Sequence, residues 1–152
     1  MTNMKQDNDT HNGKEILEQL HSGKLLVVNS RRRNGLILYK PYHSEFAGPG
    51  AAVGGMLDLD CQRAIPVGNF SLITPDSYEA RQTAYRTRRQ WVMLTKQLTD
   101  KPEPLERAER LITQFEAFFD AQVVAQIPDE VLAPLVGVLP STIAQARHNG
   151  AE

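Results

Sequence analysis

Two groups of arginines carry the most readily interpreted chemistry in this chain. Arg31–Arg33 are consecutive, and four more arginines lie close together in a stretch that predicts a helix. A guanidinium group grips a phosphate through two parallel hydrogen bonds and stays charged at physiological pH. Both groups therefore predict phosphate contacts, with solvated arginines, or arginines paired with acidic residues, as the alternative. The second group consists of Arg81, Arg86, Arg88 and Arg89.

Aromatic residues are interleaved with the second group of arginines. Tyr85 and Trp91 stand among them, and alternating arginines and aromatics can follow a single-stranded nucleic acid with its bases stacked on the rings. The alternative is that the rings face the core. We favour the core for Trp91, because Val92 and Met93 follow it directly.

A different chemistry, the reading of base edges, is available near the C-terminus. Pro140 fits the first turn of a helix, and the hydroxyl groups that follow it can accept free backbone N–H groups. Glutamine pairs with adenine in the major groove through two hydrogen bonds, and serine or threonine can bond to bases or phosphates. If residues 141–148 form a helix, the side chains that face outward are Ser141, Thr142, Gln145 and His148.

The segment Asp129–His148 has a spacing with a physical explanation. Ala133 suits a point where two helices cross, because a larger side chain would push them apart. Gly137 suits the end of a helix, where the chain adopts a left-handed conformation. An apolar set can pack the second helix against the first. It consists of Leu132, Val136, Val138, Ile143 and Ala146.

This spacing resembles the helix-turn-helix of bacterial DNA-binding regulators. The resemblance implies sequence-specific binding of double-stranded DNA by a small transcriptional regulator, as a homodimer with two recognition helices about one turn of DNA apart. Pro134 departs from the pattern, since proline disrupts a helix interior, so we expect the first helix to begin near Val131 or to be kinked. A hairpin that serves only packing or dimerisation explains the same apolar spacing.

Motifs for catalysis and cofactor binding are missing from the sequence. The four histidines lie far apart, and no Cys/His cluster has zinc spacing. Met56 stands where a phosphate-binding loop requires lysine. Asp58 and Asp60 could form an acidic pair for a metal ion on one strand face, but solvation is the more common role of two such carboxylates. Cys61 is the only cysteine, and we interpret it as a buried or incidental thiol. We expect no enzyme activity and no cofactor.

Charge divides the chain into two regions. Residues 14–98 hold 12 Lys or Arg against 7 Asp or Glu, whereas residues 99–152 hold 4 against 9. Phosphate contacts supply most of the affinity for DNA, so the acidic region needs cations from elsewhere in the fold or from a second subunit. No apolar run approaches the roughly 20 residues that span a membrane. The polar N-terminus lacks the apolar core of a secretory signal, and the single cysteine fits a reducing compartment, so we expect a cytoplasmic protein without membrane contact.

The basic region predicts a short helix and a small antiparallel sheet of about four strands. The connections are too short for helical crossovers, which makes the sheet antiparallel. Asn34-Gly35 can supply a tight turn between the first two strands, and residues 41–55 are expected to be a flexible connector. The predicted helix is Lys14–His21, and the strands are Lys24–Asn29, Leu36–Tyr39, Met56–Asp60 and Val67–Ile73.

Two long helices follow. Tyr78–Leu98 contains neither proline nor glycine, and Leu105–Ile127 has an apolar stripe at three- and four-residue steps that needs a partner, either the first long helix or another subunit. Residues 99–104 contain two prolines and break the chain between them.

The sequence as a whole predicts an α+β protein: a sheet of about four strands, two long helices and a C-terminal helix-turn-helix-like hairpin. We expect a disordered tail over residues 1–13, a basic α+β region over 14–98 and an acidic helical region over 99–152. The preferred function is DNA binding. The alternatives are a protein-interaction or assembly module without nucleic acid, and a non-specific binder of RNA or single strands that uses the arginine-rich helix.

Overall fold

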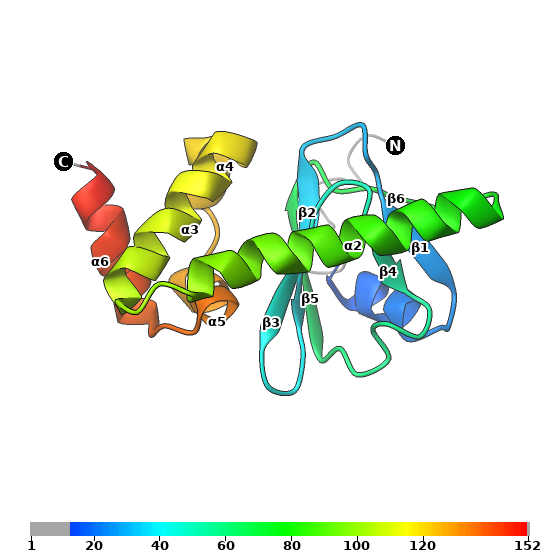
Figure 1. The fold of residues 1–152 in the computed structure, drawn as a ribbon, viewed down its shortest axis with the longest axis horizontal. Helices are drawn as coiled ribbons and strands as arrows, with labels where there is room; N and C mark the ends of the chain where they lie inside the picture. Colours follow the sequence, from blue (N-terminus) through cyan, green and yellow to red (C-terminus); the bar gives the residue numbers. More distant parts are fainter. Residues whose placement is uncertain (1–12, 152) are drawn as a thin grey trace. The chain divides into compact units, whose positions relative to one another are not determined.

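The protein is α+β and consists of two compact units, which divide between Trp91 and Val92 (Figure 1). The structure is a computed structural model that describes residues 13–151. The predicted tail, apart from Gly13, lies outside the described residues. Unit 1 contains a short helix over residues 13–20, six strands and most of helix α2 (Tyr78–Thr99). Unit 2 contains the end of α2 and four further helices.

The strands of unit 1 form two antiparallel three-stranded sheets, in place of the single sheet of about four strands that the sequence predicted. One sheet has the order β4-β1-β6 and the other the order β3-β2-β5. The strands are β1 (Leu25–Val28), β2 (Asn34–Tyr39), β3 (Ser44–Ala47), β4 (Ala52–Gly54), β5 (Arg63–Gly68) and β6 (Leu72–Ile73).

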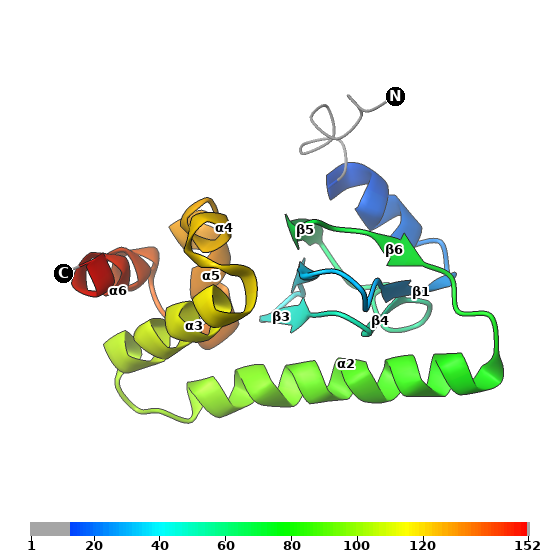
Figure 2. The same cartoon turned by 90° about the horizontal axis from the view of Figure 1, so that it is seen from above.

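Successive side chains of β1 point to opposite faces of its sheet and pack in two different apolar clusters. Leu26 and Val28 pack with residues of β2, β3, β4 and β5 in one core, which the helix over residues 13–20 also joins. Val27 points to the opposite face and packs with Ala52 and with Ala84 of α2. The unit 1 part of α2 therefore covers the outer face of the β4-β1-β6 sheet, and Figure 2 shows it running alongside these strands.

Four local predictions in unit 1 were wrong. The strand predicted over Val67–Ile73 is divided between β5, which ends at Gly68, and β6, which begins at Leu72 in the other sheet. Asn34 and Gly35 do not form a turn but begin β2, and β1 and β2 belong to different sheets. Residues 56–60 form turns where a strand was expected. The expected connector over residues 41–55 contains β3 and β4. The predicted helix Tyr78–Leu98 is confirmed, since α2 spans Tyr78–Thr99.

Unit 2 packs its helices around α3 (Pro104–Phe119), which contacts both α5 (Asp129–Val136) and α6 (Pro140–Ala151). The apolar stripe of α3 thus finds its partners in these helices of the same unit. The predicted helix Leu105–Ile127 is interrupted at Asp120, which has a positive φ of 98°. The Asp120 side chain accepts the N–H groups of Gln122 and Val123 and so caps the short helix α4 (Ala121–Ala125).

Candidate nucleic-acid interface

The helix pair α5–α6 occupies the segment that the sequence singled out for DNA reading. Gly137 ends α5 with φ 66° and ψ 42°, the left-handed conformation expected of it. The carbonyl oxygen of Ala133 accepts the N–H groups of Gly137 and Val138. Helix α5 begins at Asp129 rather than near Val131, and Pro134 stands inside it. Helices α5 and α6 are in contact; of the predicted residues, Val138 is half-buried, and the buried ones are Leu132, Ala133, Val136, Ile143 and Ala146.

An arginine of α3 holds the turn between α5 and α6. Arg107 donates from Nε to the carbonyl oxygen of Val136 at 2.9 Å and from Nη2 to that of Gly137 at 3.3 Å. Its Nη1 donates to the carbonyl oxygens of Lys101 and Pro102 at 2.8 and 3.1 Å. The C-terminal carbonyl groups of a helix lack partners within that helix, so this guanidinium both satisfies them and fixes the turn.

A second arginine, Arg147, lies on α6 itself and holds this helix in place. Arg147 donates from Nε to Asp129 Oδ1 at 2.7 Å, and its other nitrogens donate to the carbonyl oxygens of Val124 and Ile127. It therefore ties α6 to the start of α5 and to the chain that precedes it. Arg107 and Arg147 give no sign of these roles in the sequence, because their acceptors are backbone carbonyl groups that only the fold brings near.

The outward side of α6 is polar. Ser141, Gln145 and His148 are exposed, and Thr142 is half-buried. Ile143 and Ala146, which alternate with them along the helix, are buried. Leu139, in the turn before α6, is 69% exposed. The structure thus places all four predicted base-reading residues on one helix and leaves at least three of them accessible to a ligand.

The rest of unit 2 offers little positive charge for phosphate contacts. Residues 92–151 contain 5 Lys or Arg against 8 Asp or Glu. Arg107 and Arg147 donate to groups inside the unit, and Arg110 pairs with Glu106 at 3.4 Å. The excess of acidic residues that the sequence shows over residues 99–152 is therefore also present in folded unit 2.

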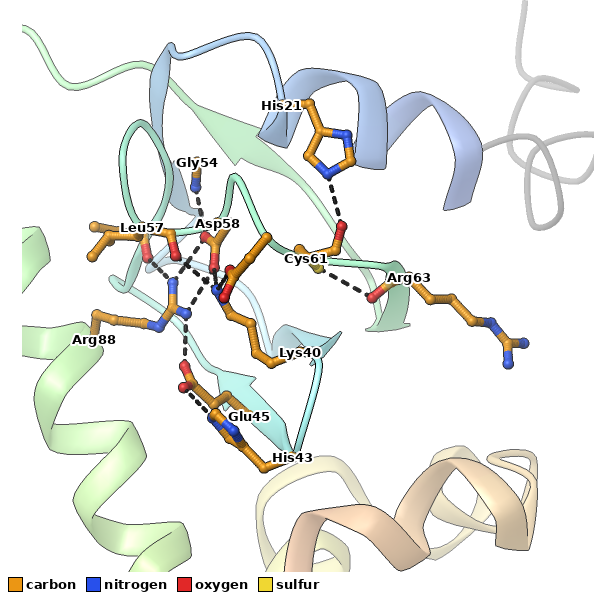
Figure 3. A network of polar contacts seen from close by, with 12 residues as sticks. His21, Lys40, His43, Glu45, Gly54, Leu57, Asp58, Cys61, Arg63 and Arg88 are labelled. Carbon is orange, nitrogen blue, oxygen red and sulfur yellow. Dashed lines mark hydrogen bonds and ion pairs between the residues drawn. The ribbon is translucent and has the colours of Figure 1, made fainter.

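Arg88, which the sequence assigned to phosphate contacts, has to be removed from that set. The residue is only 5% exposed, and its guanidinium is surrounded by acceptors of unit 1 (Figure 3). It donates to both carboxylate oxygens of Asp58 at 3.0 and 2.9 Å, to Glu45 Oε1 at 2.7 Å and to the carbonyl oxygen of Ala52 at 3.0 Å. These bonds leave it no exposed donor edge for a phosphate.

Lys40 completes the ion network on the other side of Asp58. Its Nζ lies 2.8 Å from Asp58 Oδ1 and 2.8 Å from Asp60 Oδ1, and it donates to the carbonyl oxygen of Leu57 at 2.7 Å. Asp58 is fully buried and also accepts the N–H of Gly54 at 2.7 Å. The prediction that Asp58 and Asp60 are a solvated pair on a strand face was wrong for Asp58.

The electrostatics of this network favour its charged forms. Burial acts to raise the pKa of Asp58, but hydrogen bonds and charges from Arg88 and Lys40 outweigh it, and the pKa lies below its ordinary value. The pKa of Glu45 is lowered in the same way: burial opposes the shift, and hydrogen bonds from Arg88 and His43 produce it. The network is a fully paired structural element that fastens α2 to the strands.

The remaining arginines of the predicted set are accessible. Arg31, Arg32 and Arg33 are exposed in the loop between β1 and β2, and so are Arg81, Arg86 and Arg89 on α2.

The aromatic residues are not displayed beside these arginines. Trp91 is half-buried, donates from its indole nitrogen to the carbonyl oxygen of Pro49 at 3.2 Å and meets the Phe46 ring at a centroid distance of 5.4 Å. Tyr85 packs beside Ala84 and Val27. This placement favours the core role for Trp91, and both rings are partly covered by unit 1.

Other chemistry is sparse in the described residues. Cys61 is buried, and burial raises the pKa of its thiol. Residues 13–151 contain no group of three or more His, Cys, Asp or Glu side chains placed to hold a metal ion. None of the helices within the same range is long and apolar enough to cross a membrane. Comparison with known proteins gave no matching family model, no similar curated protein and no similar solved structure.

Proposed function

We propose that this protein binds double-stranded DNA and that α6 reads the base sequence. The observation that carries the proposal is the division of α6 into two sides. Ile143 and Ala146 are buried within unit 2, while Ser141, Gln145 and His148 face solvent. A helix anchored along one side, with hydrogen-bonding groups along the other, has what major-groove recognition requires.

The anchoring supports the proposal further. Base reading needs a helix held in a fixed orientation, because hydrogen bonds to base edges are directional. Arg107 fixes the turn before α6, and Arg147 fixes α6 itself. A homodimer would present two copies of α6 about 34 Å apart, one turn of DNA, to a palindromic site. In this proposal the protein is a small transcriptional regulator.

The test compares Gln145→Ala with the unaltered protein. Sites are selected from a pool of random duplexes, and affinity for the selected site and for a scrambled duplex is measured by fluorescence anisotropy. Gln145→Ala is expected to lose about 1–3 kcal/mol of discrimination, the contribution of one bidentate base contact, while affinity for scrambled DNA stays the same. Gln114→Ala, an exposed glutamine of α3, is the matched control. Parallel loss of both affinities, or no change in either, contradicts base reading by Gln145.

One observation favours a second function, assembly through protein contacts. Unit 2 is acidic, and its arginines 107, 110 and 147 already have internal partners. In an assembly module, unit 2 of one copy would bind the basic unit 1 of another. Light scattering at low and high salt separates the two functions: salt-sensitive self-association without DNA binding supports assembly and rules out the regulator.

A further inference from the structure

The loop over residues 29–33, which carries Arg31–Arg33, lies near helix α2 at Gly50. A Cβ atom added to Gly50 would lie 3.3 Å from Thr87 Cγ2 of α2 and 3.9 Å from Ser30 Cβ. The N–H of Gly50 also donates to the carbonyl oxygen of Val28, the last residue of β1. Ser30 is the residue directly before Arg31. The start of the loop over residues 29–33 therefore lies beside the middle of α2, although Ser30 and Thr87 are 57 positions apart in sequence.

The backbone of this loop is held by asparagine side chains. Asn34 is buried and donates to the carbonyl oxygens of Asn29 and Arg32, both at 2.9 Å. Its Oδ1 accepts the N–H of Ser71 at 3.1 Å. Asn29 in turn accepts the N–H of Arg31 at 2.9 Å. The loop backbone is thus held in place while its three arginine side chains are exposed. Because the backbone is already ordered, the entropic cost of binding a ligand is lower.

The two segments that meet at this junction carry only positively charged side chains among their ionisable Lys, Arg, Asp and Glu residues. Residues 19–44 and residues 80–99 contain no Asp or Glu. Arg86 precedes Thr87 on α2, and Arg89 lies three residues further along the same helix, so the two are neighbours on its surface. Neither these two nor the loop arginines take part in any ion pair among the described residues.

We propose that the loop over residues 29–33 and the adjoining turns of α2 bind the phosphate backbone of duplex nucleic acid. The loop carries three exposed guanidinium groups and α2 carries two more, on two segments without Asp or Glu, and such an array suits a ligand with regularly repeated negative charges. Duplex is favoured over single strands, because Trp91 and Tyr85 are half-buried and pack against unit 1, which limits the ring surface available for stacking. The site would supply phosphate contacts that unit 2 lacks, but it does not rest on base reading by α6.

The test uses the full chain with the loop arginines replaced together, Arg31→Gln, Arg32→Gln and Arg33→Gln. Lys14→Gln, Lys24→Gln and Arg63→Gln together form a charge-matched control. These three residues are also exposed; Lys24 precedes β1, and Arg63 pairs with Tyr39 at the end of β2 opposite the loop. Anisotropy is measured with a labelled duplex of scrambled sequence over a range of salt concentrations, and circular dichroism checks the fold of each variant.

Each neutralised phosphate contributes about 0.9 to the slope of log affinity against log salt concentration. The loop variant is expected to reduce that slope by about 2–3, while the control variant changes it by less than about 1. Arg86→Gln should reduce it by a further unit or so. Should the loop variant misfold, the triple Arg→Lys variant retains the charge and is expected to retain the slope.

Three results would overturn this site. The first is an equal reduction by the loop and control variants, which indicates general charge attraction. The second is tighter binding of a single strand than of the duplex. The third is the absence of DNA binding together with self-association that the loop variant abolishes, which identifies a second copy of the chain as the ligand. Gln145→Ala should leave the salt slope unchanged, so failure of base reading and failure of this site are distinguishable.

Discussion

Replacing Asp58 by asparagine tests whether the buried ion network fastens α2 to the strands of unit 1. The Asp58 carboxylate accepts hydrogen bonds from Arg88 and from the N–H of Gly54 and pairs with Lys40. Asparagine keeps the shape but removes the charge, so that two buried cations face each other with only Glu45 and the more exposed Asp60 as negatively charged partners.

The expected cost of Asp58→Asn is about 3–5 kcal/mol, the usual penalty for removing one partner from a buried ion pair. A unit of about 80 residues has a total stability of roughly 4–12 kcal/mol. The substitution should therefore remove about a quarter or more of the free energy of unfolding. It should lower the melting temperature of unit 1 by more than about 10 °C.

Trp91 provides the assay, because it is the only tryptophan and packs against Phe46 in unit 1. Urea unfolding followed by its fluorescence gives the free energy for Asp58→Asn, Arg88→Gln and the double variant. The double variant should cost clearly less than the sum of the two single variants, because both partners of one interaction are neutral. Asp60→Asn is the control, since its carboxylate is largely exposed. Equal effects of Asp58→Asn and Asp60→Asn, or strict additivity in the double variant, would refute the reasoning.

Two further outcomes follow from the same contacts. In the folded protein the pKa values of Asp58 and Glu45 lie below their ordinary values of 3.8 and 4.5, so the unfolded chain binds more protons in acid. The free energy of unfolding should therefore fall as the pH drops below about 4. Urea unfolding across that range should show a weaker pH dependence for Asp58→Asn than for the unaltered protein. Arg107→Ala should speed hydrogen exchange in α5 and α6, because Arg107 holds the turn between them, but not in the strands of unit 1. Arg110→Ala, which removes only a pair within α3, should leave exchange in both regions unchanged. Faster exchange in both units of Arg107→Ala would contradict the role given to Arg107.

Elements with strong local signals could be predicted from the sequence. Helix α2 lacks proline and glycine over its length, and its bounds were predicted to within one residue. Gly137 was expected to be left-handed, and it is. The break between the long helices was expected at residues 99–104, and α2 ends at Thr99 while α3 begins at Pro104. In each case the residues that decide the structure lie within a few positions of one another.

The errors arise where distant residues decide the structure. Met56–Asp60 alternates like a strand, but Asp58 turns inward to meet Arg88, Lys40 and the Gly54 N–H, and the segment forms turns. Asn34-Gly35 has the signature of a tight hairpin turn. Instead, Gly35 lies in β2 where a Cβ atom would come within 2.5 Å of the Phe46 ring, and Asn34 organises the neighbouring loop. No local pattern identifies these partners.

The arginines show the same limit and bear most directly on function. Arg86, Arg88 and Arg89 are almost adjacent in sequence, yet only Arg88 reaches buried carboxylates, so it stabilises the fold while its neighbours stay exposed. Arg107 and Arg147 likewise serve the fold of unit 2. Once these internal arginines are set aside, exposed arginines of the predicted set remain only on unit 1, and the predicted base-reading side chains lie only on unit 2. Sequence-specific DNA binding by this chain would therefore require both units, and substitutions in each should impair different terms: salt dependence for unit 1 and base discrimination for unit 2.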